Sequence, residues 1–257
     1  MLEKEPFHQT LQALHQQAPL VHNITNYVVM NNTANALLAV GASPVMAHAI
    51  EEVEDLVAIA SALVINMGTL SPHWVTAMAR AMKKAQELGK PVVFDPVGVG
   101  ASPYRTETAL RLVYDYRPAV VRGNASEILA LAQKSQDTKG VDSTTGSENA
   151  LEAAQALSRQ LHNTIVISGA TDYIVTDASV DTVTSGSPMM ARVTGMGCTA
   201  TSIIGACLGV EPNAHRAAHH AMALMGQAGD WAAQRADGPG SFQMHFIDGL
   251  YQTTAPQ

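Results

Sequence analysis

A glycine-rich turn carries the residues of this sequence whose types and spacing best suit chemistry. Residues 193–206 read VTGMGCTATSIIGA, so Gly195, Gly197 and Cys198 precede a small and apolar run typical of a helix. The unpaired amides of a helix start bind anions, and glycines let a phosphate approach the backbone closely. We therefore predict a phosphate site at residues 195–198. The spacing matches neither GxxxxGK[ST] nor GxGxxG, so a plain helix start with a buried structural cysteine stays open.

The thiol of Cys198 is the second chemical group of this turn. A helix dipole favours the thiolate at the N-terminus, which would make the role of a base available to Cys198. Cys207 follows nine residues later. In one helix the two cysteines point to opposite faces, so we expect no disulfide between them.

Three charged residues lie at or shortly after the ends of apolar runs. Asp95, in VVFDPVG, either organises a magnesium ion near phosphates or forms an Asp-Pro turn. Arg122, in AVVRGN, needs an anionic partner, which is either a phosphate or a carboxylate at the sheet edge. Glu127 follows Asn124 by three residues, which is the spacing of a capping box. This structural role is favoured, although a helix cap and a role in chemistry can coexist in one side chain.

The segment VHNITNYVVMNNTANALLAVGASPVM, residues 21–46, is unusually rich in asparagine. Asparagine side chains either cap and bond locally or line a polar ligand pocket, and local bonding is favoured for most of them. Met46, at the end of this segment, is by base rate a core residue more often than a ligand contact.

The elements that must position these residues alternate between strands and helices. Strand-like runs cover residues 43–47, 62–68, 91–98, 118–124 and 163–169. Helical patterns separate them, and the clearest runs from Ser71 and Pro72 to Gly89. This alternation predicts right-handed crossovers and a mainly parallel sheet. Residues 172–186 break the rhythm and predict a hairpin at the sheet edge. The last third of the chain is predicted to be almost entirely helical.

Polar residues collect where the predicted strands end. In open parallel sheets, ligands bind beyond the carboxyl ends of the strands. The residues at these ends are Asn66, Gly68, Thr69, Asp95, Arg122, Asn124, Ser168 and Gly169. The pattern predicts an enzyme or a ligand-binding protein without deciding between them.

Composition and charge exclude several classes of protein. The chain has 257 residues, 47% hydrophobic and 14% charged, with a net charge of −7. Lys and Arg are scattered, which argues against a nucleic-acid partner. The first ten residues lack the apolar core of a secretory signal, and the most apolar stretch, residues 56–65, is about half the length of a membrane helix. We expect one α/β domain over residues 1–257, in the cytoplasm.

Five motifs together carry a family resemblance. VHNITNYV, GASPVMA, VVFDPVGVGAS, VVRGNASEI and VTGMGC occur in this order. The chain resembles hydroxyethylthiazole kinases, thiamin-salvage members of the ribokinase-like fold, from about residue 11 to residue 250. The resemblance implies a three-layer α/β fold, with a mainly parallel central sheet flanked by helices. It also implies phosphorylation of the primary alcohol of 4-methyl-5-(2-hydroxyethyl)thiazole by MgATP, with a product that feeds thiamin phosphate synthesis.

The same resemblance implies roles for particular residues. The residues that it implies for substrate binding are Met46, Gly195, Asn23 and Asn26, and those for catalysis are Cys198, Gly195 and Gly197. ATP would be bound by Arg122 and Ser168, and relatives often have Thr at the position of Ser168. Magnesium would be bound by Asp95 and Glu127. Sugar kinases of this fold carry an Asp where this turn has Cys198. We expect Cys198 to accept or orient the alcohol proton while the amides of residues 195–198 hold the transferring phosphoryl group.

The resemblance also implies an assembly, and it leaves rival activities. Family members are homotrimers with active sites between subunits, so the Met46 region would serve a neighbouring subunit. The rivals are a hydroxymethylpyrimidine-type kinase, an ADP-dependent NAD(P)H-hydrate dehydratase and a non-catalytic nucleotide sensor. The asparagine-rich segment and Cys198 in place of Asp favour the thiazole kinase.

Overall fold

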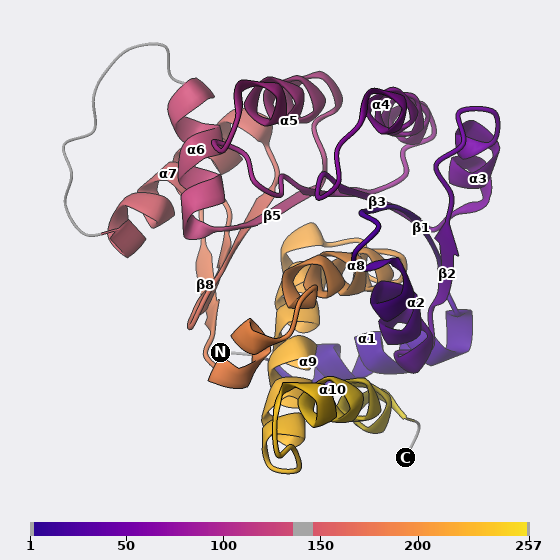
Figure 1. The fold of residues 1–257 in the computed structure, drawn as a ribbon, viewed down its shortest axis with the longest axis vertical. Coiled ribbons are helices and arrows are strands. Elements are labelled where there is room, and N and C mark those ends of the chain that lie inside the picture. The colour runs from indigo at the N-terminus through magenta and orange to yellow at the C-terminus, as the bar shows by residue number, and fades with distance from the viewer. Residues whose placement is uncertain (1–2, 136–145, 256–257) are drawn as a thin grey trace.

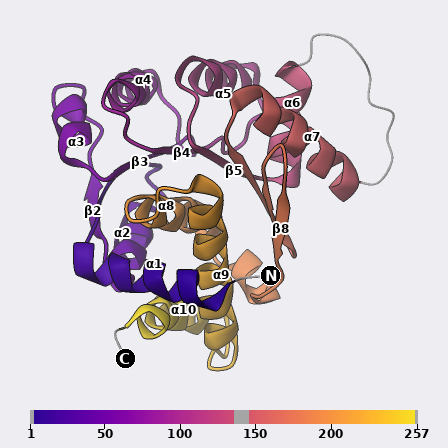
Figure 2. The same ribbon diagram turned by 180° about the vertical axis from the view of Figure 1, so that it is seen from behind.

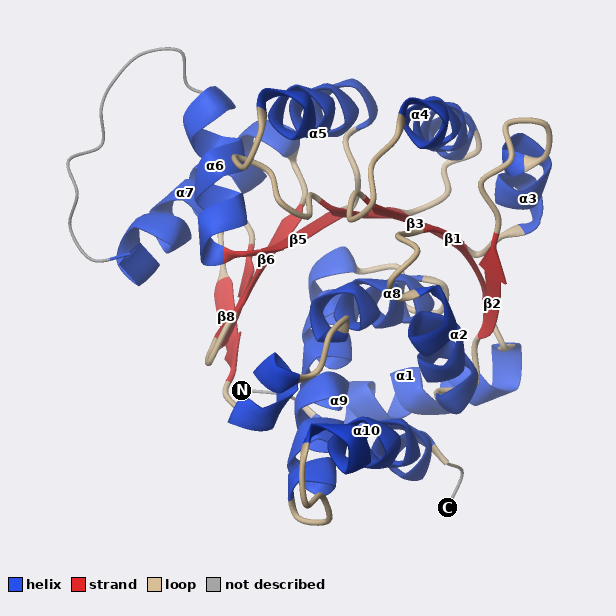
Figure 3. Ribbon diagram, viewed as in Figure 1, coloured by secondary structure: helices blue, strands red, loops and turns tan. Residues whose placement is uncertain are grey.

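A single curved sheet organises the molecule (Figure 3). The computed structural model describes residues 3–135 and 146–255. Within these residues eight strands lie in the order β2-β1-β3-β4-β5-β6-β7-β8. The strands are β1 (Leu20–Ile24), β2 (Ser43–Met46), β3 (Ala62–Asn66), β4 (Val92–Asp95), β5 (Val120–Asn124), β6 (Thr164–Ser168), β7 (Asp172–Val175) and β8 (Val180–Val183).

Strand pairing confirms the predicted topology. From β2 to β6 every neighbouring pair is parallel. Strands β7 and β8 form an antiparallel hairpin at one edge, as the break in rhythm predicted. Among the described residues, no helix is long and apolar enough to cross a membrane.

Helices cover both faces of the sheet, which gives three layers (Figures 1 and 2). The outer, convex face carries α3 (Val53–Ile59), α4 (Pro72–Glu87), α5 (Pro103–Tyr116), α6 (Ala125–Ser135) and α7 (Gly146–Leu161). The concave face holds α1 (Lys4–Gln17), α2 (Met30–Ala39), α8 (Met196–Leu208), α9 (Ala214–Ala233) and α10 (Pro239–Thr254). A short 3-10 helix, η1 (Pro188–Arg192), precedes α8. The expected three-layer α/β fold is confirmed.

Alternation along the strands builds two separate cores. Val64 and Val93 pack with α8 and α9, whereas Ile65 and Phe94 pack with the outer helices. Successive strand residues point to opposite faces, so every second residue of each strand faces the same layer. Helix α8 lies close to the sheet at Gly205, where an added Cβ would be only 2.6 Å from Val64 Cγ2. Glycine at this position therefore allows α8 to pack closely on the sheet.

Helix boundaries agree with the predicted signals, with one correction. Helix α4 starts at Pro72 after Ser71, and Gly89 beyond its end has φ +63°. Helix α8 starts at Met196, whereas the sequence placed Gly197 and Cys198 before the helical run. Gly195 adopts φ +85°, a left-handed conformation that glycine favours, and this turns the chain into the helix early. Gly197 and Cys198 consequently lie in the first turn of α8.

Candidate active site

The polar residues at the strand ends share one face of the sheet. Asn66, Asp95, Arg122 and Ser168 belong to the four neighbouring strands β3 to β6. Each stands two residues after a strand residue that packs in the concave core, so period-two alternation directs it towards α8. The expectation that residues at the carboxyl ends of the strands gather at one edge is confirmed.

Asp95 is the centre of this group. Its side chain is fully buried, and Oδ2 accepts hydrogen bonds from Thr201 Oγ1 at 2.7 Å and Asn66 Nδ2 at 3.0 Å. Arg122 Nη1 lies 3.5 Å from the same oxygen. Oδ1 has no hydrogen-bond partner among the described residues. Three groups on α8, β3 and β5 thus hold one carboxylate oxygen and leave the other available.

Burial dominates the electrostatics of Asp95. Desolvation raises the pKa of the carboxyl group, and the neighbouring Glu127 carboxylate adds to the rise. Arg122 and Thr201 oppose it, with a smaller combined effect. A buried carboxylate that is costly to ionise is typical of functional sites, because folding alone gives no reason to keep it.

Arg122 connects Asp95 to the strand β6. Its Nη2 donates to Ser168 Oγ, and Ser168 Oγ in turn lies 3.4 Å from Gly123 O. The guanidinium also lies directly on the first turn of α8, because a Cβ added to Gly197 would be 2.6 Å from Nη2 and 2.9 Å from Cζ. Arg122 therefore has the carboxylate partner that was one of its two interpretations. It also faces the first turn of α8, and its role in holding a phosphate stays a prediction.

The first turn of α8 has the expected form of an anion site. The first helical hydrogen bond runs from Thr199 N to Gly195 O at 2.8 Å, so the preceding amides start without intrahelical acceptors. Glycine is required at position 195 for two reasons. Its φ is positive, and a Cβ added there would lie 2.7 Å from Val29 Cγ1.

Cys198 faces an asparagine pair rather than an ionised partner. Asn26 Nδ2 donates to Cys198 Sγ at 3.4 Å and to Asn66 Oδ1 at 2.8 Å. Burial raises the pKa of the Cys198 thiol, and the charge of Asp95 raises it further. Sequence left the ionisation of Cys198 open, and both of these effects favour the neutral thiol. The roles of weak base and of hydroxyl locator stay predictions.

Glu127 forms the predicted capping box. Its Oε2 accepts from Asn124 N, and Asn124 Oδ1 accepts from Glu127 N, both at 2.9 Å. Oε1 accepts from Gly98 N at 2.9 Å, so the carboxylate also ties the loop after β4 to α6. The cap and a location near Asp95 coexist.

Asn23 and Met46 lie side by side in the parallel register of β1 and β2. Asn23 is 1% exposed, and its Oδ1 accepts from Ser202 Oγ of α8 at 2.8 Å. Its Nδ2 donates to Val21 O at 2.9 Å. Met46 is partly buried against the concave core. The structure therefore places Asn23 beneath the site, where it anchors α8, while its role in a thiazole pocket stays a prediction.

A cavity of about 610 Å³ opens beside Arg122 and Gly197. Its walls combine methionines with small residues, and they include Ser168, Met196, Met222 and Met225. This size and mostly apolar lining suit a ligand as large as a nucleotide. Asp172, which sequence analysis did not single out, also lines the cavity. Burial raises the pKa of Asp172 to about 6, while its bond from Gly169 N and the charge of Arg122 lower it.

Arg105 holds two loops of the site, and nothing in the sequence pattern indicated this role. Its Nη1 donates to Met67 O at 2.6 Å and Val97 O at 2.8 Å, and its Nη2 donates to Gly68 O at 2.6 Å. These carbonyls belong to the loops that follow β3 and β4. A single guanidinium from α5 therefore fixes the backbone next to Asn66 and Asp95.

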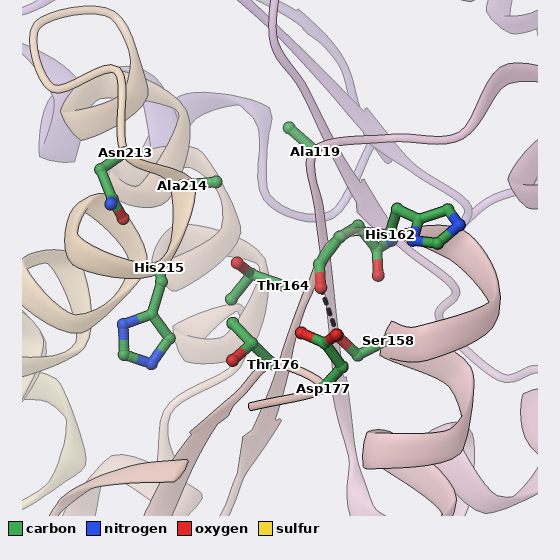
Figure 4. A pocket seen from close by; sticks show the side chains of 10 residues that line it. Ala119, Ser158, His162, Thr164, Thr176, Asp177, Asn213, Ala214 and His215 are labelled. Atoms are coloured by element: carbon green, nitrogen blue, oxygen red, sulfur yellow. Dashed lines mark hydrogen bonds between the residues drawn. The ribbon is translucent and has the colours of Figure 1, made fainter. Parts of the chain in front are cut away.

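A second cavity lies at the other end of the strands (Figure 4). It measures about 450 Å³ and is lined by Ala119 and Thr164, where β5 and β6 begin, and by Asn213 and His215 at the start of α9. It contains none of the residues predicted to do chemistry. The candidate site is the cavity at the carboxyl ends of the strands.

Comparison with known proteins agrees with this geometry. The model of the Hydroxyethylthiazole kinase family matches residues 11–256. A hydroxyethylthiazole kinase of Syntrophus aciditrophicus is 54% identical over 245 residues, which cover 95% of this chain and 91% of the relative. The solved structure of a hydroxyethylthiazole kinase protein from Pyrococcus horikoshii is 40% identical, with a TM-score of 0.89 over 96% of this chain and 92% of that one.

A more distant likeness shows the fold alone. A ribokinase-like superfamily protein of Enterococcus faecalis has a TM-score of 0.67 at 17% identity, over 99% of this chain and 96% of that one. Family match, high identity over nearly the whole chain and a site built on the expected motifs lead to one conclusion. The chain belongs to the hydroxyethylthiazole kinase family.

Proposed function

We propose that this protein transfers the γ-phosphoryl group of ATP to the primary alcohol of 4-methyl-5-(2-hydroxyethyl)thiazole. It does so as a single cytoplasmic kinase domain of residues 1–257 in thiamin salvage. The observation that carries the proposal is the junction of Arg122, Asp95 and the first turn of α8 at the edge of a nucleotide-sized cavity. Family membership supplies the identity of the acceptor.

Each group at this junction has a task. Phosphoryl transfer passes through a loose transition state, so catalysis rests on positioning and charge neutralisation more than on a strong base. Arg122, with Ser168, would hold the phosphates, and the amides of residues 195–198 would hold the transferring group. Asn26 orients the Cys198 thiol, which then locates the acceptor hydroxyl; Met46 and Asn23 belong to the acceptor side.

Magnesium fits the donor set of this site. Mg²⁺ prefers carboxylate oxygens and keeps several of its waters. Asp95 Oδ1 is a buried oxygen with no hydrogen-bond partner among the described residues, and Glu127 is close enough to influence its charge. Asp95 and Glu127 are therefore the residues we propose for the ion, either directly or through its waters. The ion would neutralise charge on the β- and γ-phosphates.

One reaction tests the function. Protein, MgATP and the thiazole alcohol are incubated together, and ADP and the phosphorylated alcohol are measured. We expect both products in equal amounts. A hydroxymethylpyrimidine-type kinase would instead use the pyrimidine alcohol, a dehydratase would consume hydrated NAD(P)H with ADP, and a sensor would yield no product. Turnover of the pyrimidine alcohol in preference to the thiazole would refute the proposal.

Replacement of Cys198 should have a moderate effect on turnover. Cys198→Ala removes the group that locates the acceptor hydroxyl, and we expect kcat to fall about tenfold. This is below the ~10²–10⁴ of a full general base, because the thiol is not ionised. Cys198→Asp restores an oxygen acceptor and should retain or raise turnover. Steady-state kinetics decide the matter, and unchanged kcat in the alanine variant would remove Cys198 from the transfer step.

Acid should strengthen nucleotide binding through Asp172. Its pKa of about 6 means that it loses its charge as the pH falls through that value. A neutral Asp172 side chain in the cavity lining repels an anionic nucleotide less than a charged one does. Between about pH 7.5 and about pH 5, the Kd of wild type for ADP should fall relative to that of Asp172→Asn. Calorimetry measures the Kd of both proteins at each pH, and the titration of ADP itself cancels in the ratio of the two Kd values. A constant ratio of the two Kd values would contradict the prediction.

The proposed assembly is a homotrimer with sites between subunits. Two apolar side chains next to the site support it: Tyr27 is 63% exposed and Val28 is 61% exposed, and both follow Asn26 directly. Exposed apolar side chains beside a site are typical of surfaces that bind another chain. Light scattering on the eluted protein measures the mass, and a monomer that is fully active would contradict the assembly.

A further inference from the structure

Asn66 is a buried amide whose two ends have different partners. It ends β3 and is 1% exposed. Its Oδ1 accepts from Asn26 Nδ2 at 2.8 Å and from Gly68 N at 2.9 Å, while its Nδ2 donates to Asp95 Oδ2 at 3.0 Å. A backbone N–H can only donate and an ionised carboxylate can only accept. The orientation of the Asn66 amide is therefore set by its neighbours at both ends.

Asn26 is fixed in the same way. Its Oδ1 accepts from Val28 N at 3.1 Å, so its Nδ2 must face Asn66 and Cys198. Asn26 is packed tightly against the backbone of Gly68, because a Cβ added to Gly68 would lie 2.5 Å from Asn26 Cγ. A hydrogen-bond chain of fixed orientation thus links Cys198, Asn26, Asn66 and Asp95. Asn26 Nδ2 donates to Cys198 and to Asn66, and Asn66 Nδ2 donates to Asp95.

We propose that Asn66 is a positioning residue that fixes the Asp95 carboxylate relative to Cys198 during phosphoryl transfer. The inference rests on the proposed function and adds a residue to it. Asn66 and Thr201 both donate to Oδ2 of Asp95, which leaves Oδ1 without a hydrogen-bond partner among the described residues and so available to the reaction. Through Asn26 the same amide sets the place of the thiol. One side chain therefore ties the acceptor side of the site to its phosphate side.

The rival explanation is that Asn66 only caps the turn after β3 through Gly68 N. Asn66→Asp separates the two, since a carboxylate of the same shape still accepts from Gly68 N and Asn26 Nδ2. The amide donor, which serves Asp95 and also faces the Cys198 thiol, is lost, and a second carboxylate faces the first. We expect kcat to fall about 10²-fold, the usual cost of a misplaced catalytic group, with KM for the alcohol changed less than about threefold.

A matched control is available in Asn163→Asp. Asn163 Nδ2 donates to Pro118 O at 3.1 Å, at the opposite ends of β5 and β6, so this variant also replaces an amide donor by a carboxylate. Its stability should fall while kcat remains that of wild type. If Asn66→Asp is folded and keeps kcat within about threefold, the positioning role is overturned.

Thermal unfolding supplies a readout that does not depend on activity. The double variant Asn66→Asp with Asp95→Asn exchanges donor and acceptor, so the hydrogen bond between positions 66 and 95 re-forms in reverse. The amide nitrogen that makes it can no longer accept from Thr201 or face Arg122 as a carboxylate oxygen does, so recovery is partial. The unfolding midpoint of the double variant should lie above that of Asn66→Asp, while kcat stays low. An unrestored midpoint would overturn the coupling. If wild type fails to phosphorylate the thiazole alcohol, the proposed function falls, and the unfolding cycle still decides whether Asn66 and Asp95 are coupled.

Discussion

Gly197→Ala is expected to lower kcat/KM for ATP by about 10²-fold in a protein that stays folded. The added methyl group would lie 2.6 Å from Arg122 Nη2 and 2.9 Å from Cζ, so the guanidinium must leave the helix start. It would then lose its place between Asp95, Ser168 and the phosphate site. The helix itself is not harmed, because alanine is a better helix former than glycine by about 1 kcal/mol.

The chain offers a matched control for this change. Gly240 occupies the second position of α10, as Gly197 does in α8. Apart from the adjoining backbone, no atom of the described residues lies within 4 Å of a Cβ added there. Gly240→Ala should leave the ATP kinetics unchanged. Steady-state kinetics and unfolding of both variants make the comparison. Equal kinetics for Gly197→Ala and Gly240→Ala would show that the contact with Arg122 has no part in the reaction.

Asp95→Asn should lower kcat by about 10²–10³-fold, the cost of losing one preorganised electrostatic group from an active site. The amide keeps an oxygen to accept from Thr201 and Asn66, so the local bonds survive. What disappears is the charge that faces Arg122 and the proposed magnesium ion. Steady-state kinetics at saturating ATP and alcohol measure the loss, and Asp115→Asn on the exposed side of α5 is the control.

Asp95→Asn should lower kcat without lowering the stability of the protein. Burial raises the pKa of Asp95, so the folded state disfavours its ionised form. The stability that such a group contributes is present below its unfolded pKa and is lost as the pH rises through its folded pKa. At a pH above the folded pKa, Asp95→Asn should therefore unfold at a temperature equal to or above that of wild type. A lower midpoint together with lower kcat would mean that Asp95 is chiefly structural.

The parts of the site that sequence predicted are those carried by strand ends. Asp95, Arg122 and Ser168 end apolar runs whose alternation has period two, and neighbouring parallel strands bring such ends together. The glycine turn was recognisable because a helix start needs no tertiary information to bind an anion. The capping box of Asn124 and Glu127 is likewise a local pattern, and the structure contains it.

The parts that sequence missed depend on contacts between distant segments. Thr201 binds Asp95 across 106 residues of chain, and Arg105 reaches the carbonyl of Met67 across 38. Nothing in the residues around either one specifies such a partner. The ionisation of Cys198 could not be decided from sequence for the same reason, because a helix dipole is visible in sequence whereas burial beside Asp95 is not.

The position of the terminal phosphate tests the central claim most directly. A crystal structure of the protein with Mg²⁺, a non-hydrolysable ATP analogue and the thiazole alcohol would show it. We expect the terminal phosphate to accept hydrogen bonds from the amides of residues 195–198, to contact Arg122, and to face an alcohol held beside Cys198. A terminal phosphate bound away from the start of α8 would refute the proposed site of phosphoryl transfer.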